Sequence, residues 1–414
     1  MGKKYLFITQ SDLSMQDSNG RTLRDVFGYV DNKDIYSFCT NRKNPVLSAK
    51  QTFCIDQNRL FKKKRIHRDA DSETLLKSKT IDGRNKKNPL TCILRNLAWN
   101  MSFVFWKSKF KKWIRQINPD VIVFNPGDFA FMHKIATFAS KIANKKLVIY
   151  NTEDYYFKTW NYLHDERGFK KLYPAFRKQL VRAYNKSFNA SKIIMHNTPG
   201  LMSAYSAVFK STKHAVVYHP SNLIAKEADS SNMPITSEFY YCGALDKGRD
   251  KTLILFAKLL ERVIPEALIV VNGPAPKECL KVFSKCQNIK YEGIIEYQEV
   301  SRNLLKKRLL LSINSLDEYQ LKDKKHAFST KLSDYVASFN IIFHISLAND
   351  EYNVIRDNNL GFVSSCETEI INNLQKLSNC LEKNVNPFKD NMVKFYKRYL
   401  NPISIYNFVR KEVE

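Results

Sequence analysis

Short runs of apolar residues, rich in β-branched and aromatic side chains, recur along the chain between polar turns. In the first half they lie at 4–9, 120–125, 146–151, 192–197 and 215–220, and in the second half at 238–245, 267–274, 288–294, 308–314, 340–346 and 360–365. Most are apolar almost throughout, as expected for strands buried on both faces of a parallel sheet. Segments with helical periodicity separate many of them, including 129–144, 251–263, 296–307 and 349–358. This alternation predicts a doubly wound α/β fold.

The strand–helix pattern occurs twice, and a polar, turn-rich segment at 219–237 separates the two occurrences. A chain of 414 residues is also too long for one ordinary core, which favours two domains. We therefore expect Rossmann-like domains at 1–220 and 238–390, joined by a linker at 221–237. Such domains would face each other across a cleft at the carboxyl ends of their parallel sheets.

The charge of the chain favours a polyanionic partner. Lys and Arg total 67 against 40 Asp and Glu, a formal net charge of +27. Nucleic acid, an anionic membrane or a phosphorylated small molecule would fit, and a solvated basic surface explains the charge equally well. The chain carries no RRM, KH, helix-turn-helix or zinc pattern, so no nucleic-acid partner is expected. The very basic stretch 58–90 is interpreted as a mobile surface loop, and its "DAD" sequence at 69–71 is not expected to bind metal.

The cysteines and the apolar segments favour a cytoplasmic location. Eight cysteines lie far apart and form no CxxC pair, which argues against a zinc or thioredoxin-like site and fits reduced thiols. The apolar run at the N-terminus has the length of a strand and not the pattern of a secretory signal. No window approaches 18 continuous apolar residues, so no membrane span is expected. Residues 391–414 are expected to form a helix broken around Pro402.

Residues 93–117 predict a long helix, in which aromatic and apolar side chains repeat at spacings of three and four. Cations cluster near its end, where they also suit the helix dipole. One interpretation is an aromatic stripe that faces the core, with a solvated basic face. The other is contact with anionic lipid, which would hold the protein peripherally on the inner face of the cytoplasmic membrane. The residues expected at that membrane or acceptor contact are Trp106, Lys107, Lys111, Lys112 and Trp113.

Two strand-to-helix turns in the second half carry residues suited to phosphate. In "CGALDKGRD" a strand ends at Gly243 and a helix begins near Asp250, with Lys247 and Arg249 in the turn. Glycine permits close backbone approach, and a helix N-terminus beside cations is a natural phosphate site. By itself this pattern is not specific, because strand-to-helix turns often contain Gly and Lys.

The stretch "FSTKLSDYVAS" at 328–338 has a similar pattern. Ser329 and Thr330 are N-cap residues, so a helix should begin near Lys331 and present amides and an ammonium group to phosphate. Asp334 follows one turn later, and its carboxylate would suit two vicinal hydroxyls, such as those of a ribose. The alternative interpretation is a capping box formed by the Ser or Thr and the Asp.

The order of the motifs between about 238 and 365 resembles the donor-binding half of two-domain GT-B glycosyltransferases, in particular glycosyltransferase family four. These motifs are "CGALDKGRD", "VVNGP", "NIKYEGI", "FSTKLSDYVASFNIIF" and an acidic helix that ends in "LGFV". The first half resembles the family more loosely, through "KKYLFIT", "INPDVIVFN" and "KKLVIYNTEDYY". The resemblance implies a nucleotide-sugar donor in the second domain, an acceptor in the first, and a C-terminal helix that crosses back to the first domain.

The resemblance also implies roles for individual residues. Lys247 falls on the family's diphosphate-binding lysine, Asp334 on the residue that holds the ribose, and Gly20 on the loop beneath the diphosphate. The turn that cradles the donor phosphates corresponds to Ser329, Thr330 and Lys331. Cations would stabilise the charge on the departing nucleoside diphosphate, so no metal and no cofactor beyond the donor co-substrate is expected.

Catalytic candidates come from both halves. Glu153 and Asp154 fall on a cleft-facing loop of the first domain, where either could orient or deprotonate an acceptor hydroxyl, or simply cap a following helix. His326 stands where the family has a glutamate near the transferred sugar, and it could contact the sugar or lie on the surface. Ala244 stands where the family usually has an arginine.

The sequence therefore predicts a retaining, metal-independent glycosyltransferase. It would move a sugar from a nucleotide sugar to a glycan or lipid-linked acceptor, in bacterial cell-surface polysaccharide synthesis such as that of capsule or lipopolysaccharide. Three other interpretations stay open. One is another GT-B enzyme, either an inverting transferase or a nucleotide-sugar epimerase, and one is a basic nucleic-acid-binding protein, which the net charge of +27 would explain. The last is a non-catalytic GT-B scaffold, which the departures at Ala244 and His326 keep open.

Overall fold

The computed structural model describes residues 2–13, 18–41, 47–55, 88–163, 169–223 and 236–414. Most of the basic stretch 58–90, with its "DAD" sequence, and most of the expected linker 221–237 lie outside the described residues. Contacts divide the described chain into two compact units. Unit 1 comprises the described residues up to Pro220 together with Pro402–Glu414, and unit 2 comprises those of Ser221–Asn401.

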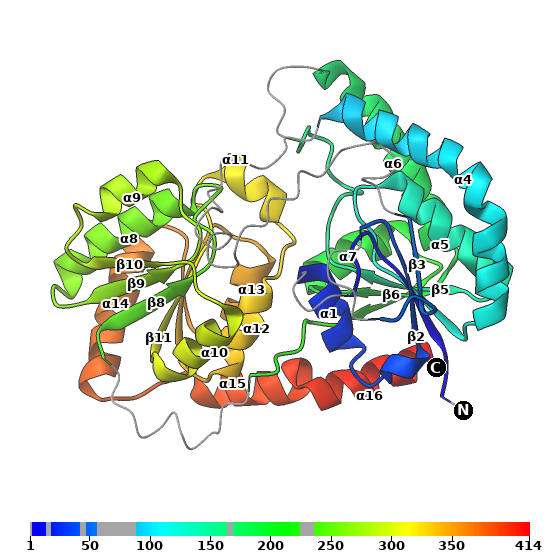
Figure 1. Cartoon of the computed structure of the whole chain (residues 1–414). Coiled ribbons are helices and arrows are strands. Elements are labelled where there is room, and N and C mark those ends of the chain that lie inside the picture. Colours follow the sequence, from blue (N-terminus) through cyan, green and yellow to red (C-terminus); the bar gives the residue numbers. More distant parts are fainter. Residues whose placement is uncertain (1, 14–17, 42–46, 56–87, 164–168, 224–235) are drawn as a thin grey trace. The chain divides into compact units, whose positions relative to one another are not determined.

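Unit 1 is built on a sheet whose described strands are parallel and lie in the order β3-β2-β1-β4-β5-β6-β7 (Figure 1). Their bounds are Tyr5–Ile8 (β1), Ile35–Cys39 (β2), Thr52–Cys54 (β3), Val121–Phe124 (β4), Leu147–Asn151 (β5), Ser191–His196 (β6) and Lys213–Val216 (β7). The direction in which strands are added reverses between β1 and β4. Doubly wound sheets bind ligands at such a switch point, beyond the carboxyl ends of the strands.

Helices cover both faces of this sheet. They are α1 (Ser18–Val26), α4 (Pro89–Ile117), α5 (Ala130–Ala143), α6 (Tyr173–Phe188), α7 (Pro199–Val208) and α16 (Pro402–Val413), with 3-10 turns at Asn32–Asp34 and Lys170–Leu172. Leu6 and Ile8 of β1 lie in one core cluster with residues of α4 to α7. Tyr5 and Phe7 lie in another with residues of α1 and α16. Burial on both faces explains the continuous apolar run, because successive strand side chains point to opposite faces.

Helix α4 confirms the long helix expected at 93–117 and begins slightly earlier. Its N-terminus is a capping box, in which the Thr91 amide donates to Asn88 Oδ1 at 2.8 Å and the Asn88 amide donates to Thr91 Oγ1 at 3.2 Å. It ends at Asn118, which adopts a left-handed φ of 49°. Its buried stripe lies in the core of unit 1 and includes Trp99, Phe103, Trp106, Phe110 and Ile114.

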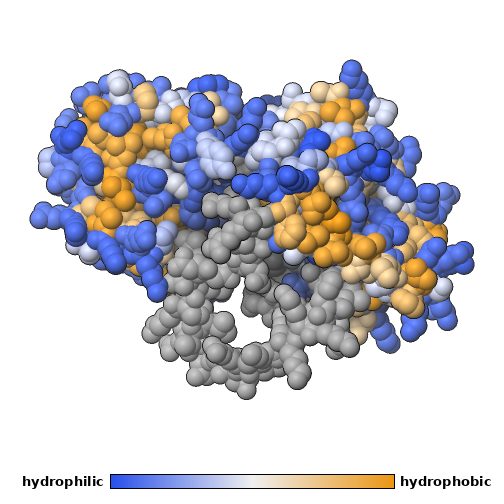
Figure 2. Space-filling view, turned by 90° about the horizontal axis from the view of Figure 1, so that it is seen from above, coloured by the Kyte–Doolittle hydropathy of each residue, from blue (hydrophilic) through white to orange (hydrophobic). Residues whose placement is uncertain are grey.

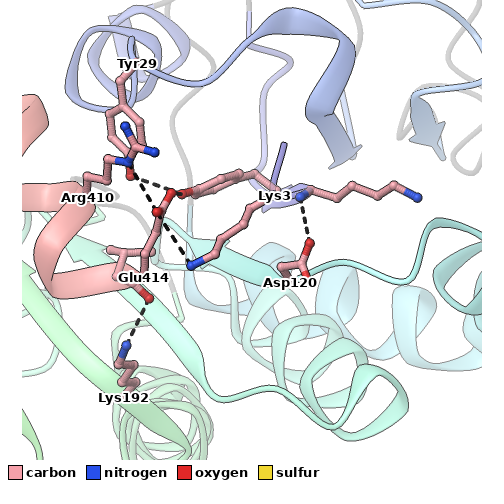
Figure 3. A network of polar contacts seen from close by, with 9 residues as sticks. Lys3, Tyr29, Asp120, Lys192, Arg410 and Glu414 are labelled. Atoms are coloured by element: carbon pink, nitrogen blue, oxygen red, sulfur yellow. Dashed lines mark hydrogen bonds and ion pairs between the residues drawn. The ribbon is translucent and has the colours of Figure 1, made fainter. Parts of the chain in front are cut away.

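The C-terminal helix α16 packs on unit 1 through Ile405, Val409 and Val413. The carboxylate of Glu414 accepts hydrogen bonds from the Tyr5 hydroxyl at 2.9 Å and from Arg410 Nε at 3.2 Å (Figure 3). Lys192 donates to the carbonyl oxygen of Val413 at 3.0 Å. Partial burial of the Glu414 carboxyl acts to raise its pKa. The hydrogen bonds from Tyr5 and Arg410, together with the positive charges of Lys3 and Arg410, outweigh burial and hold the pKa below its usual value.

Unit 2 repeats the architecture with parallel described strands in the order β10-β9-β8-β11-β12-β13 (Figure 1). The strands are Glu238–Cys242 (β8), Leu268–Asn272 (β9), Ile289–Gly293 (β10), Leu309–Ile313 (β11), Ile341–Ile345 (β12) and Phe362–Ser364 (β13). Its switch point lies between β8 and β11. The two parallel-sheet units confirm the predicted doubly wound α/β class.

The helices of unit 2 include those expected at 251–263, 296–307 and 349–358. Their bounds are Arg249–Val263 (α8), Lys277–Phe283 (α9), Tyr297–Lys306 (α10), Glu318–Leu321 (α11), Thr330–Ala337 (α12), Asp350–Asp357 (α13), Glu367–Glu382 (α14) and Lys389–Phe395 (α15), with a 3-10 turn at Lys322–Lys324 and a π-helical turn at Tyr396–Leu400. The terminal helix is interrupted at Asn401, directly before Pro402, as expected from the proline.

Candidate functional site

Lys331 lies against the carboxyl end of β8, at the switch point of unit 2. Its Nζ donates to the carbonyl oxygen of Cys242 at 2.8 Å and lies 5.3 Å from the centre of the Tyr241 ring. A Cβ at Gly243 would lie 2.1 Å from this Nζ, and Gly243 has a φ of 145°. Only glycine suits that conformation and that spacing. Desolvation of the ammonium group lowers the pKa of Lys331.

The turn after β8 brings further cations to the same end of the sheet. Lys247 and Gly248 both have left-handed backbones, with φ of 55° and 82°, and α8 begins at Arg249. The Arg249 guanidinium lies 3.1 Å from Asp246 Oδ1 and donates to Asn314 Oδ1 at 3.4 Å. Arg249 therefore connects the turn to the residue that follows β11.

Helix α12 begins where the sequence predicts. Ser329 is its N-cap residue, and its Oγ accepts from the Lys331 amide at 3.3 Å. The Ser329 amide donates to Glu351 Oε1 at 2.5 Å, and Asn314 Nδ2 donates to Glu351 Oε2 at 2.6 Å. The buried Glu351 carboxylate of α13 thus joins Ser329, the N-cap residue of α12, to Asn314, which directly follows β11. The sequence analysis did not select Glu351 or Asn314.

Asp334 is buried on the second turn of α12 and accepts two hydroxyl donors. The Ser221 hydroxyl donates to Oδ1 at 2.6 Å, and the Tyr297 hydroxyl donates to Oδ2 at 2.9 Å. The Ser329 amide, which a capping box would direct to this acid, donates to Glu351 instead. Neither Ser221 nor Tyr297 was selected from the sequence.

His326 is half-buried and lies beside an acid. Its Nδ1 is 3.3 Å from Asp350 Oδ2, at the start of α13. The Ala244 carbonyl oxygen accepts a hydrogen bond from Arg249 at 3.3 Å, so the position that departs from the family motif still contacts a cation through its backbone. The role of His326 toward a sugar remains a prediction.

Unit 1 has a hollow of about 190 Å³ at its own switch point. The residues that follow β1, β4 and β5 line it together with α1, and they include Thr9, Ser11, Gly20, Asn125, Asp128 and Glu153. Two residues selected from distant parts of the sequence, Gly20 and Glu153, are therefore brought together. Hydroxyl, amide and carboxylate groups surround this space, which suits a polyhydroxylated ligand.

Asp154 does not line that hollow. Its carboxylate is 3.0 Å from the ammonium group of Lys158, and both side chains are almost fully buried. The Lys158 ammonium also lies over the rings of Tyr155 and Tyr162, at 4.8 and 5.2 Å from their centres. Asp154 is thus engaged in an internal ion pair, whereas the neighbouring Glu153 lines the hollow.

The residues selected on α4 divide between its two faces. Trp106 is only 8% exposed and lies in the core, so the structure corrects its assignment to a membrane contact. Trp113 packs partly against that core, and its indole donates to the Lys50 carbonyl oxygen at 3.3 Å. Lys107 and Lys112 are exposed, and Lys111 is half-buried. The regular spacing of the aromatic residues therefore corresponds to the buried face of the helix, as in the first of the two interpretations.

Among the described residues, no group of three or more His, Cys, Asp or Glu side chains is arranged to hold a metal ion. Within those same ranges, no helix combines the length and apolar character that crossing a membrane requires.

No family model and no curated protein sequence matches the chain. Sucrose-phosphate synthase from Thermosynechococcus elongatus matches in structure with a TM-score of 0.62 and 10% identity, over 99% of this chain and 98% of that one. Anabaena HepE, crystallised with UDP and glucose, gives 0.59 and 12% over 99% of both chains. The lipopolysaccharide outer core galactosyltransferase WaaB gives 0.57 and 12%, also over 99% of both. Together with the two parallel-sheet units, these similarities show that the chain has the GT-B fold.

Proposed function

We propose that this protein is a glycosyltransferase whose unit 2 binds a nucleotide-sugar donor. The observation that carries the proposal is the group of residues at the switch point of unit 2. Lys331, the Lys247–Arg249 turn and the N-terminus of α12 lie at the ends of adjacent strands, with Asp334 one turn further on. The complexes of HepE with UDP and with UDP-glucose support this class of ligand.

The diphosphate would bind between the two cationic turns. The N-termini of helices α8 and α12 carry the positive ends of their dipoles, which would attract an incoming anion, and Lys331 and Lys247 add formal charge. During transfer the bond between the anomeric carbon and the β-phosphate oxygen breaks, and negative charge accumulates on the nucleoside diphosphate. Fixed cations and amides stabilise the transition state, in which this charge has developed, more than they stabilise the ground state. They would therefore lower the barrier without a metal ion.

Asp334 would hold the ribose. In the structure two hydroxyl groups, from Ser221 and Tyr297, donate to its two carboxylate oxygens. The vicinal hydroxyls of a ribose have the same donor chemistry, and they would replace or share these positions. The buried carboxylate would therefore exchange one pair of hydroxyl donors for another, which limits the desolvation cost of binding.

The acceptor would bind at the hollow of unit 1. Glu153 lines this space and is the candidate base, or orienting group, for an acceptor hydroxyl. We propose transfer with retention to a glycan or lipid-linked acceptor in cell-surface polysaccharide synthesis. The similarity to WaaB, a lipopolysaccharide outer core galactosyltransferase, supports that pathway. Inverting transfer and epimerisation are the alternatives. The anomeric configuration of the glycosylated acceptor, read by NMR, distinguishes retention from inversion, and an altered sugar without any glycosylated acceptor indicates epimerisation.

A panel of nucleoside diphosphates and nucleotide sugars tests the donor proposal. We expect one nucleotide to stabilise the protein by about 2.7 kcal/mol at a hundredfold excess over its Kd. Lys331→Ala and Asp334→Ala should abolish this shift, whereas Lys258→Ala, an exposed lysine on α8, should preserve it. Release of nucleoside diphosphate in the presence of acceptor would then establish turnover. If RNA or DNA stabilises the protein and no nucleotide does, the proposal is wrong.

A further inference from the structure

Helix α4 presents an apolar strip to solvent on the side opposite its buried stripe. The strip comprises Leu94, Leu97, Met101, Val104 and Phe105, with Val104 74% and Phe105 86% exposed. These positions recur at spacings of three and four, so they form one face of the helix. Figure 2, viewed from the side on which α4 lies, shows apolar surface beside hydrophilic surface on unit 1. Large contiguous apolar surface is unusual on a soluble monomer and marks an interaction site.

The same face turns basic toward the end of the helix. Ser108, Lys111, Lys112, Arg115 and Gln116 line a shallow hollow of about 370 Å³ there. No Asp or Glu occurs in 89–117, although the segment carries six Lys and Arg residues: Arg95, Lys107, Lys109, Lys111, Lys112 and Arg115. Among the described residues, none of the three cations that line the hollow has an ion-pair partner. The helix dipole favours cations at this end, but it does not require an apolar strip in line with them.

An anionic bilayer fits both halves of this face. A helix that lies in the plane of the membrane interface inserts its apolar side chains at the acyl boundary, and its Lys and Arg side chains bind the phosphate headgroups. From Leu94 to Arg115 the helix spans roughly 32 Å, at 1.5 Å per residue. Nucleic acid would leave the aliphatic strip exposed to water. A second copy packed symmetrically on this face would set cations against cations or against the apolar strip.

We infer that the outward face of α4, from Leu94 to Arg115, docks the protein on a bilayer that contains anionic lipids. Phe105 and its apolar neighbours insert at the headgroup boundary, and Lys111, Lys112 and Arg115 bind lipid phosphates. The buried stripe of the helix stays in the core of unit 1, so docking requires no unfolding. The inference rests on this face alone and does not depend on the donor chemistry of unit 2.

Vesicle co-sedimentation tests the inference with the full-length chain. The probes are vesicles of phosphatidylcholine alone and of phosphatidylcholine with phosphatidylglycerol. We expect binding to the anionic vesicles that weakens as salt rises. Replacing Lys111, Lys112 and Arg115 together by Ala should lower the partition coefficient roughly 100-fold, since each cation near an anionic surface contributes about fivefold. Val104→Ser with Phe105→Ser should lower it at least about tenfold.

Matched variants distinguish docking at this face from non-specific electrostatic attraction and from non-specific apolar adsorption to vesicles. The control for charge replaces Lys258, Lys281 and Lys285, exposed lysines of unit 2, by Ala. The control for apolar exposure replaces Ile403 and Phe408, exposed on α16, by Ser. Both controls should bind like the wild type. All substituted side chains are exposed or half-exposed, and unchanged thermal unfolding would confirm intact folding.

Three outcomes would overturn the inference. The first is no binding to anionic vesicles at low salt. The second is equal binding by the α4 variants and their controls. The third combines two results for the wild-type protein: it does not bind vesicles, and sedimentation velocity shows a concentration-dependent dimer. Val104→Ser with Phe105→Ser would abolish that dimer.

Discussion

At the scale of single residues, the close packing of Gly243 against Lys331 is the contact that the donor proposal depends on most. We expect Gly243→Ala to displace the ammonium group, because the new Cβ would lie 2.1 Å from Nζ. Nucleotide affinity should fall at least about tenfold, and stability should fall by roughly 1–2 kcal/mol from the strained backbone. Calorimetric titration and thermal unfolding measure the two effects.

The matched control for that substitution is Gly293→Ala. Gly293 also has a left-handed φ, 82°, but nothing lies within 4 Å of a Cβ built there. It therefore imposes backbone strain without the clash. If the two variants lose nucleotide affinity equally, the position of the Lys331 ammonium group does not determine binding.

The neighbours Glu153 and Asp154 should behave oppositely when substituted. Asp154→Asn leaves the buried Lys158 ammonium uncompensated, and we expect a loss of about 3–5 kcal/mol in stability. Glu153→Gln should leave stability within about 0.5 kcal/mol and lower kcat by about 100-fold or more if Glu153 is the base. Urea unfolding and steady-state kinetics test this pair. A stable Asp154→Asn variant that is inactive would reverse the assignment.

Sequence reasoning at this scale selected residues that lie within one motif and missed those that meet them from elsewhere. Lys331 and Asp334 are three residues apart at the start of one helix, so their proximity follows from local periodicity. Ser221 and Glu351 reach the same turn from segments more than a hundred and about twenty residues away, and only the sheet topology places them there. Trp106 shows a second limit of sequence reasoning. Periodicity identifies one face of a helix, but it does not say whether that face lies in the core or in solvent.

At the scale of elements, the anchorage of α16 predicts a pH dependence. The pKa of Glu414 is lowered in the folded state, so its contribution to stability is present above the unfolded pKa of about 4.3 and is lost as pH falls through the folded value. We expect Glu414→Gln to cost about 1 kcal/mol near neutral pH, since hydrogen bonds from Tyr5 and Arg410 weaken. The difference from wild type should vanish toward acid pH.

Tryptophan fluorescence during urea unfolding measures this effect in the relevant unit, because all four tryptophans of the chain belong to unit 1. Glu382→Gln, at an exposed acid of α14, is the control and should show no pH-dependent difference. A Glu414 variant whose stability deficit grows as pH falls would contradict the assignment of the sign.

Element prediction succeeded where burial imposes a pattern. Every strand expected from a continuous apolar run is present, and most of the bounds agree within about two residues. The ends differ most at β7, which stops at Val216 and not at 220, and at β8, which stops at Cys242 and not at 245. Most of these strands are buried on both faces, although β7 and β10 are partly exposed. The edge strand β3 has three half-buried residues, and β2 mixes Tyr, Ser and Cys, so neither produces such a run. The sequence analysis likewise selected no helix at α1, α6, α7 or α14. Helix α1 is short and polar, and α6 carries polar and basic residues among its aromatic ones.

At the scale of the whole molecule, the GT-B fold provides two switch points, each lined by residues from strands that are distant in sequence. The contact-based division of the described chain begins unit 2 at Ser221, inside the polar segment expected to separate the domains. The C-terminal helix could be placed on unit 1 from family resemblance but not from periodicity, since its apolar face would fit either core. What the sequence alone could not supply are the residues that reach each switch point from distant segments, such as Asn314 and Glu351 in unit 2.

Hydrogen exchange distinguishes the roles of the two switch points. We expect the bound nucleotide to slow amide exchange most at Gly243–Arg249 and at the start of α12, because these backbone groups would contact phosphate. Residues Thr9–Ser11 and Glu153, which line the hollow of unit 1, should respond more to acceptor than to donor. Asp334→Ala should remove the protection in unit 2 without altering exchange in the core strands of unit 1. If a nucleoside diphosphate instead protects the hollow of unit 1 and leaves α12 unchanged, the donor lies in unit 1 and the assignment of the two units is reversed.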